Sequence, residues 1–144
     1  MSVSDRLKAL KEEKSAANLL AAENFLSENA TKPGVVVLAS GLQYQILVEG
    51  QGEKPKLNNI VTCHYHGTLI NGEVFDSSVK RGQPASFPVN GVIKGWIEAL
   101  QLMPVGSKWR LFLHPNLAYG DRQVSAVIGP NCALVFDVEL ISFR

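Results

Sequence analysis

The sequence has few of the features that mark metal-binding, nucleic-acid-binding or membrane proteins. It holds two cysteines in 144 residues, and neither belongs to a CxxC pair or a Cys/His cluster, so the usual zinc-binding spacings are absent. No apolar run approaches the ~20 residues that a membrane helix needs. The formal net charge is +1, which predicts no attraction to nucleic acid or to anionic lipid. We therefore expect no metal, no nucleic-acid partner and no membrane span.

The two cysteines, Cys63 and Cys132, lie in apolar runs that are typical of strands. Cysteine packs as a small hydrophobic residue, so we expect buried free thiols. The sequence alone leaves a disulfide between them open.

The composition is 46% hydrophobic and 19% charged, which is typical of a globular domain with a real core. Residues 1–14 are polar and charged, so the chain as given carries no secretory signal. This predicts a cytoplasmic protein. A periplasmic or secreted location stays open if an upstream signal was removed.

The N-terminal part reads as one long helix over residues 4–29, with Ser4 as a possible cap and strong helix formers throughout. Lys32-Pro33-Gly34 ends it, and we place a domain boundary there, with a helical arm over 1–33 and the main domain over 34–144. A thin apolar stripe has heptad-like spacing: Val3, Leu7, Leu10, Ala17 and Ala21. The helix is interpreted as a solvated spacer, with a partner-binding or dimer-forming helix as the alternative.

From Val35 onward, the hydrophobic period changes to two. This alternation predicts strands over 42–48, 61–69, 73–76, 86–89, 108–113 and 134–141, and one short helix over 93–102. Residues 77–85 and 114–131 are expected to be loops. The predicted fold is α+β, a curved antiparallel sheet of five to six strands wrapped around one short helix.

Two short stretches predict a ligand pocket between that sheet and that helix. Val74–Ser78 places the carboxylate of Asp76 beside an aromatic ring, and Val92–Trp96 holds two β-branched residues and an indole. A single carboxylate among large apolar side chains is typical of a site for a small, mostly apolar ligand.

Five motifs occur in order: His64–Leu69 (HYHGTL), Gly72–Ser78 (GEVFDSS), Val92–Trp96 (VIKGW), Leu117–Gly120 (LAYG) and Leu134–Leu140 (LVFDVEL). Together they resemble the FKBP family of peptidyl-prolyl cis-trans isomerases over residues 40–143. The preceding helix is similar to that of the Mip-like subgroup, in which such a helix connects the domain to a dimerisation segment. The resemblance therefore implies proline-containing substrates, the macrolides tacrolimus and rapamycin as inhibitors, and no cofactor.

The resemblance also implies roles for individual residues. Asp76, Tyr119 and Tyr65 would be catalytic, with Asp76 facing the twisting amide and Tyr119 donating to a substrate carbonyl, as would the Ile93 backbone N–H. Trp96 would be the floor beneath the proline ring, and Arg81 would orient Asp76 or Tyr65. The substrate- and macrolide-binding set is Tyr65, Phe75, Asp76, Arg81, Phe87, Val92, Ile93, Trp96, Tyr119, Val127, Ile128 and Phe136.

Each of these residues also has a purely structural interpretation. Trp96 can be a core residue, Tyr119 a loop anchor, Arg81 a solvated charge, and Asp76 a turn cap acting with its serine neighbours. His64 and His66 are interpreted as strand-face residues and His114 as a strand end. A hydrolase built from Ser77, His64 and Asp76 lacks a nucleophile-elbow motif.

The predicted function is rotation of X-Pro bonds, with an apolar residue favoured before the proline. The alternative is a proline-peptide-binding module or holdase chaperone with little turnover. The loop over residues 121–131 departs from the family pattern, because it lacks the usual Ile-Pro-Pro, and its Val127 and Ile128 are expected to form an apolar tip over the pocket.

Overall fold

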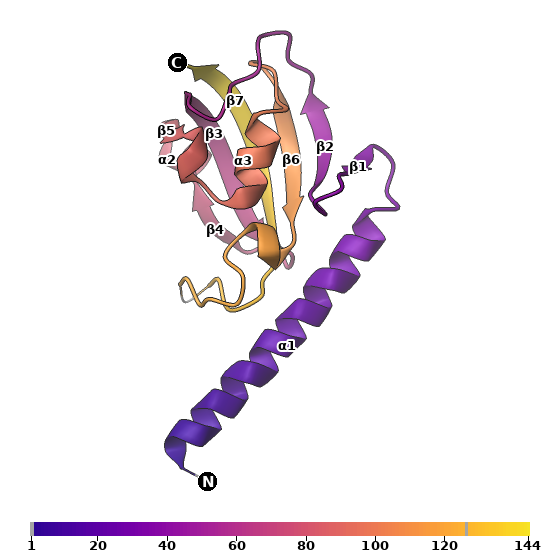
Figure 1. Cartoon of the computed structure of the whole chain (residues 1–144), viewed down its shortest axis with the longest axis vertical. Helices are drawn as coiled ribbons and strands as arrows, with labels where there is room; N and C mark the ends of the chain where they lie inside the picture. The colour runs from indigo at the N-terminus through magenta and orange to yellow at the C-terminus, as the bar shows by residue number, and fades with distance from the viewer. Residues whose placement is uncertain (1, 126) are drawn as a thin grey trace.

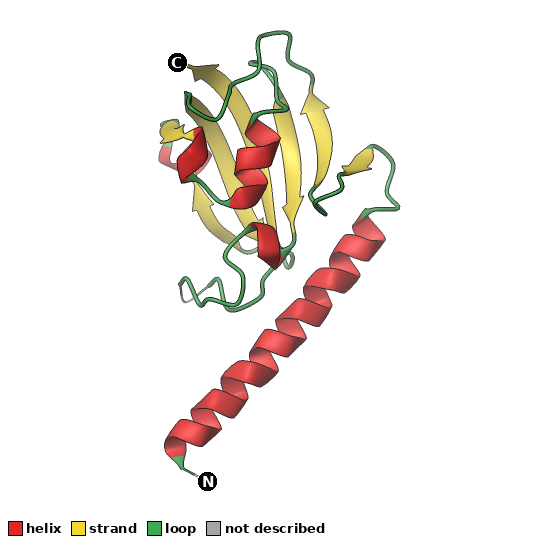
Figure 2. Ribbon diagram, viewed as in Figure 1, coloured by secondary structure: helices red, strands yellow, loops and turns green. Residues whose placement is uncertain are grey.

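The computed structural model describes residues 2–125 and 127–144. A long helix, α1 (Val3–Asn29), lies along one side of a body in which a curved antiparallel sheet faces the short helix α3 (Lys94–Leu100) (Figure 1). Figure 2 shows that strands make up most of the body, with short helices and loops on one face of the sheet. The predicted α+β fold is confirmed.

The sheet has seven strands in the order β1-β2-β6-β7-β3-β4, with β5 also pairing with β3. Their bounds are β1 (Val35–Val37), β2 (Gln43–Val48), β3 (Ile60–Leu69), β4 (Val74–Ser77), β5 (Ala85–Pro88), β6 (Lys108–Leu113) and β7 (Leu134–Phe143). The additional strand relative to the expected five or six is β1, which pairs with β2 at the sheet edge. Three consecutive valines show no alternation, so this strand gave no period-two signal.

Two short helical segments, α2 (Ser78–Arg81) and η2 (Pro115–Leu117), occupy stretches expected to be loops. A third, η1 (Val89–Gly91), begins at Val89, which was expected to end a strand. Each has four residues or fewer, too short for helical periodicity to show in the sequence. His114, expected at a strand end, is the N-cap of η2, and its Nδ1 accepts from the Asn116 backbone N–H at 3.1 Å.

The core lies between the concave face of the sheet and α3. Alternate residues of the central strands are buried there, among them Val61 and Cys63 of β3 and Val138 and Leu140 of β7. The helix packs closely because Gly95 has no side chain: a Cβ there would lie 2.6 Å from Leu113 Cδ2. The predicted period-two patterns therefore identify the buried face correctly in β3, β6 and β7. The prediction is wrong for the second half of β2, where Ile46 and Val48 are exposed.

Helix α1 begins one residue earlier than expected, and its cap is Ser2 rather than Ser4. The Ser2 side chain accepts from the Asp5 backbone N–H, and the Asp5 carboxylate accepts from the Ser2 N–H, which forms a capping box. Ser4 lies inside the helix.

The face of α1 that contacts the body is not the predicted apolar stripe. Val3, Leu7 and Leu10 of that stripe are exposed, whereas Ala22 and Leu26 are buried. The ring of Phe25 lies 6.2 Å from that of Phe112 on β6.

A buried pair of amides joins the end of α1 to the sheet. Asn29 Nδ2 donates to Gln43 Oε1 at 2.8 Å, and Gln43 Nε2 donates to the Leu26 carbonyl at 2.9 Å. Because both side chains are buried, these bonds fix the junction between α1 and β2. The boundary proposed at residues 33–34 stays a prediction.

Both cysteines are free, as expected, but their surroundings differ. Cys63 is buried in β3, and burial raises the pKa of its thiol to about 12, which leaves it protonated and unreactive at neutral pH. Cys132 is only half-buried and precedes β7 rather than lying in a strand. Among the described residues, no helix is long and apolar enough to cross a membrane.

We predict that Asn29→Ala lowers the free energy of unfolding by about 1–3 kcal/mol, because it leaves the Gln43 carbonyl oxygen buried without its donor. Urea denaturation measures this. Asn24→Ala, at an exposed position of the same helix, is the matched control and should change the free energy by less than about 0.5 kcal/mol. Equal values for both variants would contradict the role assigned to the buried pair.

Candidate functional site

A cavity of about 550 Å³ opens between the sheet and α3, within the usual range for small-ligand sites. Trp96, from the first turn of α3, is at its centre and only 4% exposed. Its ring is edge-to-face with the rings of Tyr65, Phe87 and Phe136, at centroid distances of 5.5, 5.7 and 5.3 Å. Phe75 meets Phe136 in the same way at 5.4 Å. The walls are therefore aromatic and rigid.

Gly67 in β3 makes this arrangement of rings possible. A Cβ at that position would lie 2.6 Å from Phe75 Cζ and 2.8 Å from Phe136 Cε1, closer than carbon atoms can approach. Any larger residue would therefore displace two walls of the cavity.

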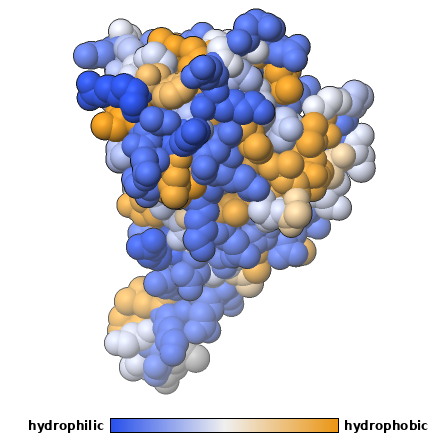
Figure 3. Space-filling view, turned by 45° about the horizontal axis from the view of Figure 1, so that its top comes forward, coloured by the Kyte–Doolittle hydropathy of each residue, from blue (hydrophilic) through white to orange (hydrophobic). Residues whose placement is uncertain are grey.

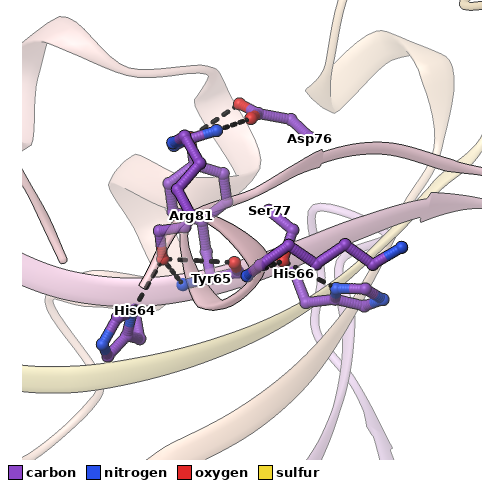
Figure 4. A network of polar contacts seen from close by, with 8 residues as sticks. His64, Tyr65, His66, Asp76, Ser77 and Arg81 are labelled. Atoms are coloured by element: carbon purple, nitrogen blue, oxygen red, sulfur yellow. Dashed lines mark hydrogen bonds and ion pairs between the residues drawn. The ribbon is translucent and has the colours of Figure 1, made fainter. Parts of the chain in front are cut away.

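One polar cluster borders the cavity, formed by Tyr65, Asp76 and Arg81 (Figure 4). The Tyr65 hydroxyl donates to Asp76 Oδ2 at 2.6 Å, and Arg81 Nη2 donates to that hydroxyl at 2.8 Å. Arg81 Nη1 forms an ion pair with Asp76 Oδ1. Arg81 thus contacts two of the three candidate catalytic residues, Tyr65 and Asp76, from the short helix α2.

These contacts set the charge of the cluster. Burial by itself would raise the pKa of Asp76, but the hydrogen bonds from Tyr65 and Arg81 and the positive charge of Arg81 bring the pKa of this carboxyl below its ordinary value. Burial, followed by the hydrogen bond to Asp76, raises the pKa of Tyr65. At neutral pH the cluster therefore presents an ionised carboxylate and a neutral phenol.

The serines that follow Asp76 hold α2 against β3. Ser77 Oγ accepts from the Lys80 backbone N–H at 3.2 Å and caps α2, and it lies 2.9 Å from His66 Nδ1. Ser78 Oγ accepts from the Tyr65 backbone N–H at 2.8 Å and lies 2.9 Å from His64 Nδ1. The cap of this turn is Ser77, so the alternative in which Asp76 is only a cap loses its basis.

The same contacts show that Ser77, His64 and Asp76 do not form the hydrogen-bonded triad that a hydrolase would need. His64 pairs with Ser78 and not with Ser77, while Asp76 binds Tyr65 and Arg81. Among the residues that the structure describes, no group of three or more His, Cys, Asp or Glu side chains could hold a metal ion.

Nine of the predicted pocket residues line the cavity: Tyr65, Phe75, Asp76, Phe87, Val92, Ile93, Trp96, Tyr119 and Phe136. Arg81 stands outside the lining and contacts two lining residues, Asp76 and Tyr65. Ile128 is buried in the hydrophobic core, and Val127 is half-buried away from the lining. These two residues do not form an apolar tip over the cavity.

Four lining residues were not predicted: Gly91, Lys94, Ala118 and Arg122. Gly91, Lys94 and Ala118 lie beside or within the motifs that marked the pocket, so proximity in sequence was an available signal. Arg122 lies in the divergent loop over residues 121–131, where the sequence gave no signal that a residue lines the pocket.

The Trp96 indole Nε1 is buried and has no hydrogen-bond partner within residues 2–125 and 127–144. An unpaired buried donor destabilises a fold by about 1–3 kcal/mol, and such exceptions concentrate at functional sites.

A curved sheet around one helix, with an aromatic cavity and one ionised carboxylate at its edge, is typical of a domain with a site for a small, mostly apolar ligand. Comparison of the sequence with models of known protein families identifies the family of this domain. Residues 51–141 match the family model for FKBP-type peptidyl-prolyl cis-trans isomerase, and residues 1–46 match that for the domain amino terminal to it. The chain belongs to the FKBP-type peptidyl-prolyl cis-trans isomerase family.

Individual relatives agree with this assignment. The chain is 58% identical over 120 residues to the peptidyl-prolyl cis-trans isomerase Mip of Coxiella burnetii, covering 83% of this chain and 52% of that protein. It is 50% identical to the FKBP-type 22 kDa isomerase of Escherichia coli, covering 96% and 68%. The crystal structure of FkpA from Escherichia coli superimposes with a TM-score of 0.94 at 41% identity, covering 99% and 66%. The chain spans about half the length of several curated relatives.

We predict a pH dependence from the lowered pKa of Asp76. A carboxyl whose pKa is lower in the folded than in the unfolded protein stabilises the fold above the unfolded value of about 3.9, and this contribution is lost as the pH falls through the folded value. The difference in unfolding free energy between the wild type and Asp76→Asn should stay constant from pH 8 to 5 and shrink below about pH 4.

Urea denaturation across that pH series measures the difference. Asp121→Asn removes an exposed carboxylate and serves as the control for general charge effects. A difference that already shrinks between pH 7 and pH 5 would show that Tyr65 and Arg81 do not hold the carboxylate in its ionised form.

Proposed function

We propose that this protein catalyses cis-trans rotation of X-Pro peptide bonds in polypeptides. The observation that carries the proposal is the rigid aromatic cavity around Trp96, bordered by the ionised Asp76. Membership of a family named for this reaction supports it.

The chemistry requires no nucleophile. An X-Pro bond rotates over a barrier of about 18–20 kcal/mol because resonance holds the amide planar. In the twisted transition state that resonance is lost and the carbonyl becomes less polar, so an apolar cavity stabilises it relative to water. Stabilising the transition state by about 4–5 kcal/mol more than the planar isomers gives an acceleration of roughly a thousandfold or more.

We assign the roles as follows. The proline ring lies on Trp96, and the Asp76 carboxylate faces the twisting amide. Tyr119, which lines the cavity from the segment after η2, donates through its hydroxyl to a substrate carbonyl. Ile93 is the N-cap of α3, and its backbone N–H donates to a second carbonyl. Arg81 and Tyr65 hold Asp76 in position.

The competing function is a proline-peptide-binding module or holdase with little turnover. The divergent loop favours it, because it brings the cation of Arg122 to the cavity instead of an apolar tip. The same cavity would bind tacrolimus and rapamycin under either function, so inhibitor binding supports the site and not the turnover.

The deciding measurement is cis-trans exchange of a short Leu-Pro peptide, followed by NMR at catalytic protein concentration. We expect fast exchange that rapamycin blocks. Saturable peptide binding without exchange would establish the binding module and exclude the isomerase.

Two variants test the residue roles. We expect Tyr119→Phe and Asp76→Ala to lower kcat/KM about tenfold, since each removes one hydrogen bond or charge contact worth roughly 1–1.5 kcal/mol. Tyr44→Phe alters a tyrosine that stacks on Trp109 and is absent from the cavity lining. It is the matched control and should retain wild-type turnover, and full activity in both site variants would refute the assignment.

The compartment is a separate question. The comparisons give no support to the cytoplasmic location expected from the sequence, and one relative, from Legionella longbeachae, is named an outer membrane protein. Fractionation of the source cells is the test.

We also propose that α1 mediates self-association. Val3, Leu7 and Leu10 are 73%, 63% and 61% exposed, and apolar atoms are visible at the projecting end of the helix (Figure 3). Their spacing of three and four residues places them on one face of α1, which a second copy of this helix could cover.

Sedimentation equilibrium tests this on the full chain. We expect a dimer that Leu7→Glu together with Leu10→Glu converts to a monomer, because a charge in an apolar seam is unfavourable. Lys8→Glu and Lys11→Glu, at exposed positions one residue along, form the matched control. A monomeric wild type would refute the proposal.

A further inference from the structure

Helix α1 contacts a loop that reaches the cavity. The rim loop, defined here as residues 118–125 and 127–131, lies between η2 and β7. In Figure 1 it lies at the end of the body next to the middle of α1. Ala118, Tyr119 and Arg122 at its start line the cavity, while its final residues touch the helix.

Two hydrogen bonds join the end of the rim loop to α1. Asn18 Nδ2 donates to the Pro130 carbonyl at 2.8 Å, and Asn131 Nδ2 donates to Ser15 Oγ at 2.7 Å. Pro130 is fully buried, and Ser15, Asn18 and Asn131 are each half-buried. These bonds are therefore partly shielded from competing water.

Side chains of α1 also pack closely against the backbone of the rim loop at this point. A Cβ on Gly129 would lie 3.2 Å from Lys14 Cε and 3.4 Å from Asn18 Nδ2. The Lys14 and Asn18 side chains thus lie directly against the loop backbone at Gly129.

Asn131 bonds to both the helix and the start of the loop. Its side chain binds α1, while its backbone N–H donates to the Gly120 carbonyl at 2.8 Å. Gly120 follows Tyr119 directly. Asn131 also has a left-handed backbone, with φ of 54°, a conformation that is unfavourable for most residues but tolerated by asparagine. Two hydrogen bonds therefore connect α1 to Gly120, the residue that follows the candidate catalytic Tyr119.

We propose that α1 positions the rim loop through Asn18 and Asn131, and thereby sets substrate selectivity at the cavity. This rests on the proposed function for its turnover readout. Arg122 is the rim-loop residue whose charge a substrate would meet, so a displaced loop changes the preference between peptides of different charge near the proline. Asn18 and Asn131 are positioning residues and do not touch the substrate.

The experiment compares kcat/KM for a Glu-Pro and a Leu-Pro peptide in the full chain. Asn18→Ala removes one hydrogen bond, and Asn131→Gly removes the other while allowing the left-handed backbone. In each we expect the Glu-Pro to Leu-Pro ratio to fall about twofold to fivefold, as for the loss of an exposed ion pair. A role in stability alone would lower both values equally and leave the ratio unchanged.

Asn24→Ala, the same substitution on an exposed face of α1, is the matched control and should keep the wild-type ratio. An unchanged Glu-Pro to Leu-Pro ratio in Asn18→Ala and Asn131→Gly would overturn the proposal. If Asn131→Gly does not fold, the ratio in Asn18→Ala is the deciding result. Should the wild type lack turnover, the proposed function fails, and the ratio of dissociation constants for the two peptides tests the positioning role instead.

Discussion

The edge-to-face packing of aromatic rings around Trp96 is the interaction on which the rest of the site depends. Rings that meet edge to face near 5.5 Å stabilise one another, and these rings line the cavity. The sheet supplies three of the rings and α3 supplies the indole. Gly67 and Gly95 provide the clearance that lets the rings and the helix approach.

The polar character of the cavity comes from one carboxylate, that of Asp76, and from the residues that bind it. Asp76 stays ionised because Tyr65 and Arg81 bind it more strongly than burial penalises it. Two elements hold the Asp76 carboxylate, because Arg81 contacts it from α2 and Tyr65 from β3. Its position at the edge of the cavity leaves it accessible to a substrate. The serines and histidines beside it serve to hold α2 on β3.

The N-terminal helix is integrated with the body over its C-terminal half. Buried amides at Asn29 and Gln43 fix its end, and Asn18 and Asn131 bring its middle against the rim loop. Its N-terminal apolar residues face outward. Under the two proposals made for this helix, its middle positions the rim loop while its exposed N-terminal residues meet another copy.

The sequence by itself determined the α+β architecture, because alternation is a local property that neighbouring residues reveal. Its five motifs implied nine of the cavity residues only through their resemblance to the FKBP family. Tertiary structure decided which face of α1 packs, since Ser15, Asn18 and Asn29 look like solvent-facing polar residues until their distant partners are known. It also decided that Ile128 enters the core while Arg122 lines the cavity. Within an irregular loop no periodicity distinguishes inward from outward residues, so only contacts between segments far apart in the chain fix that choice.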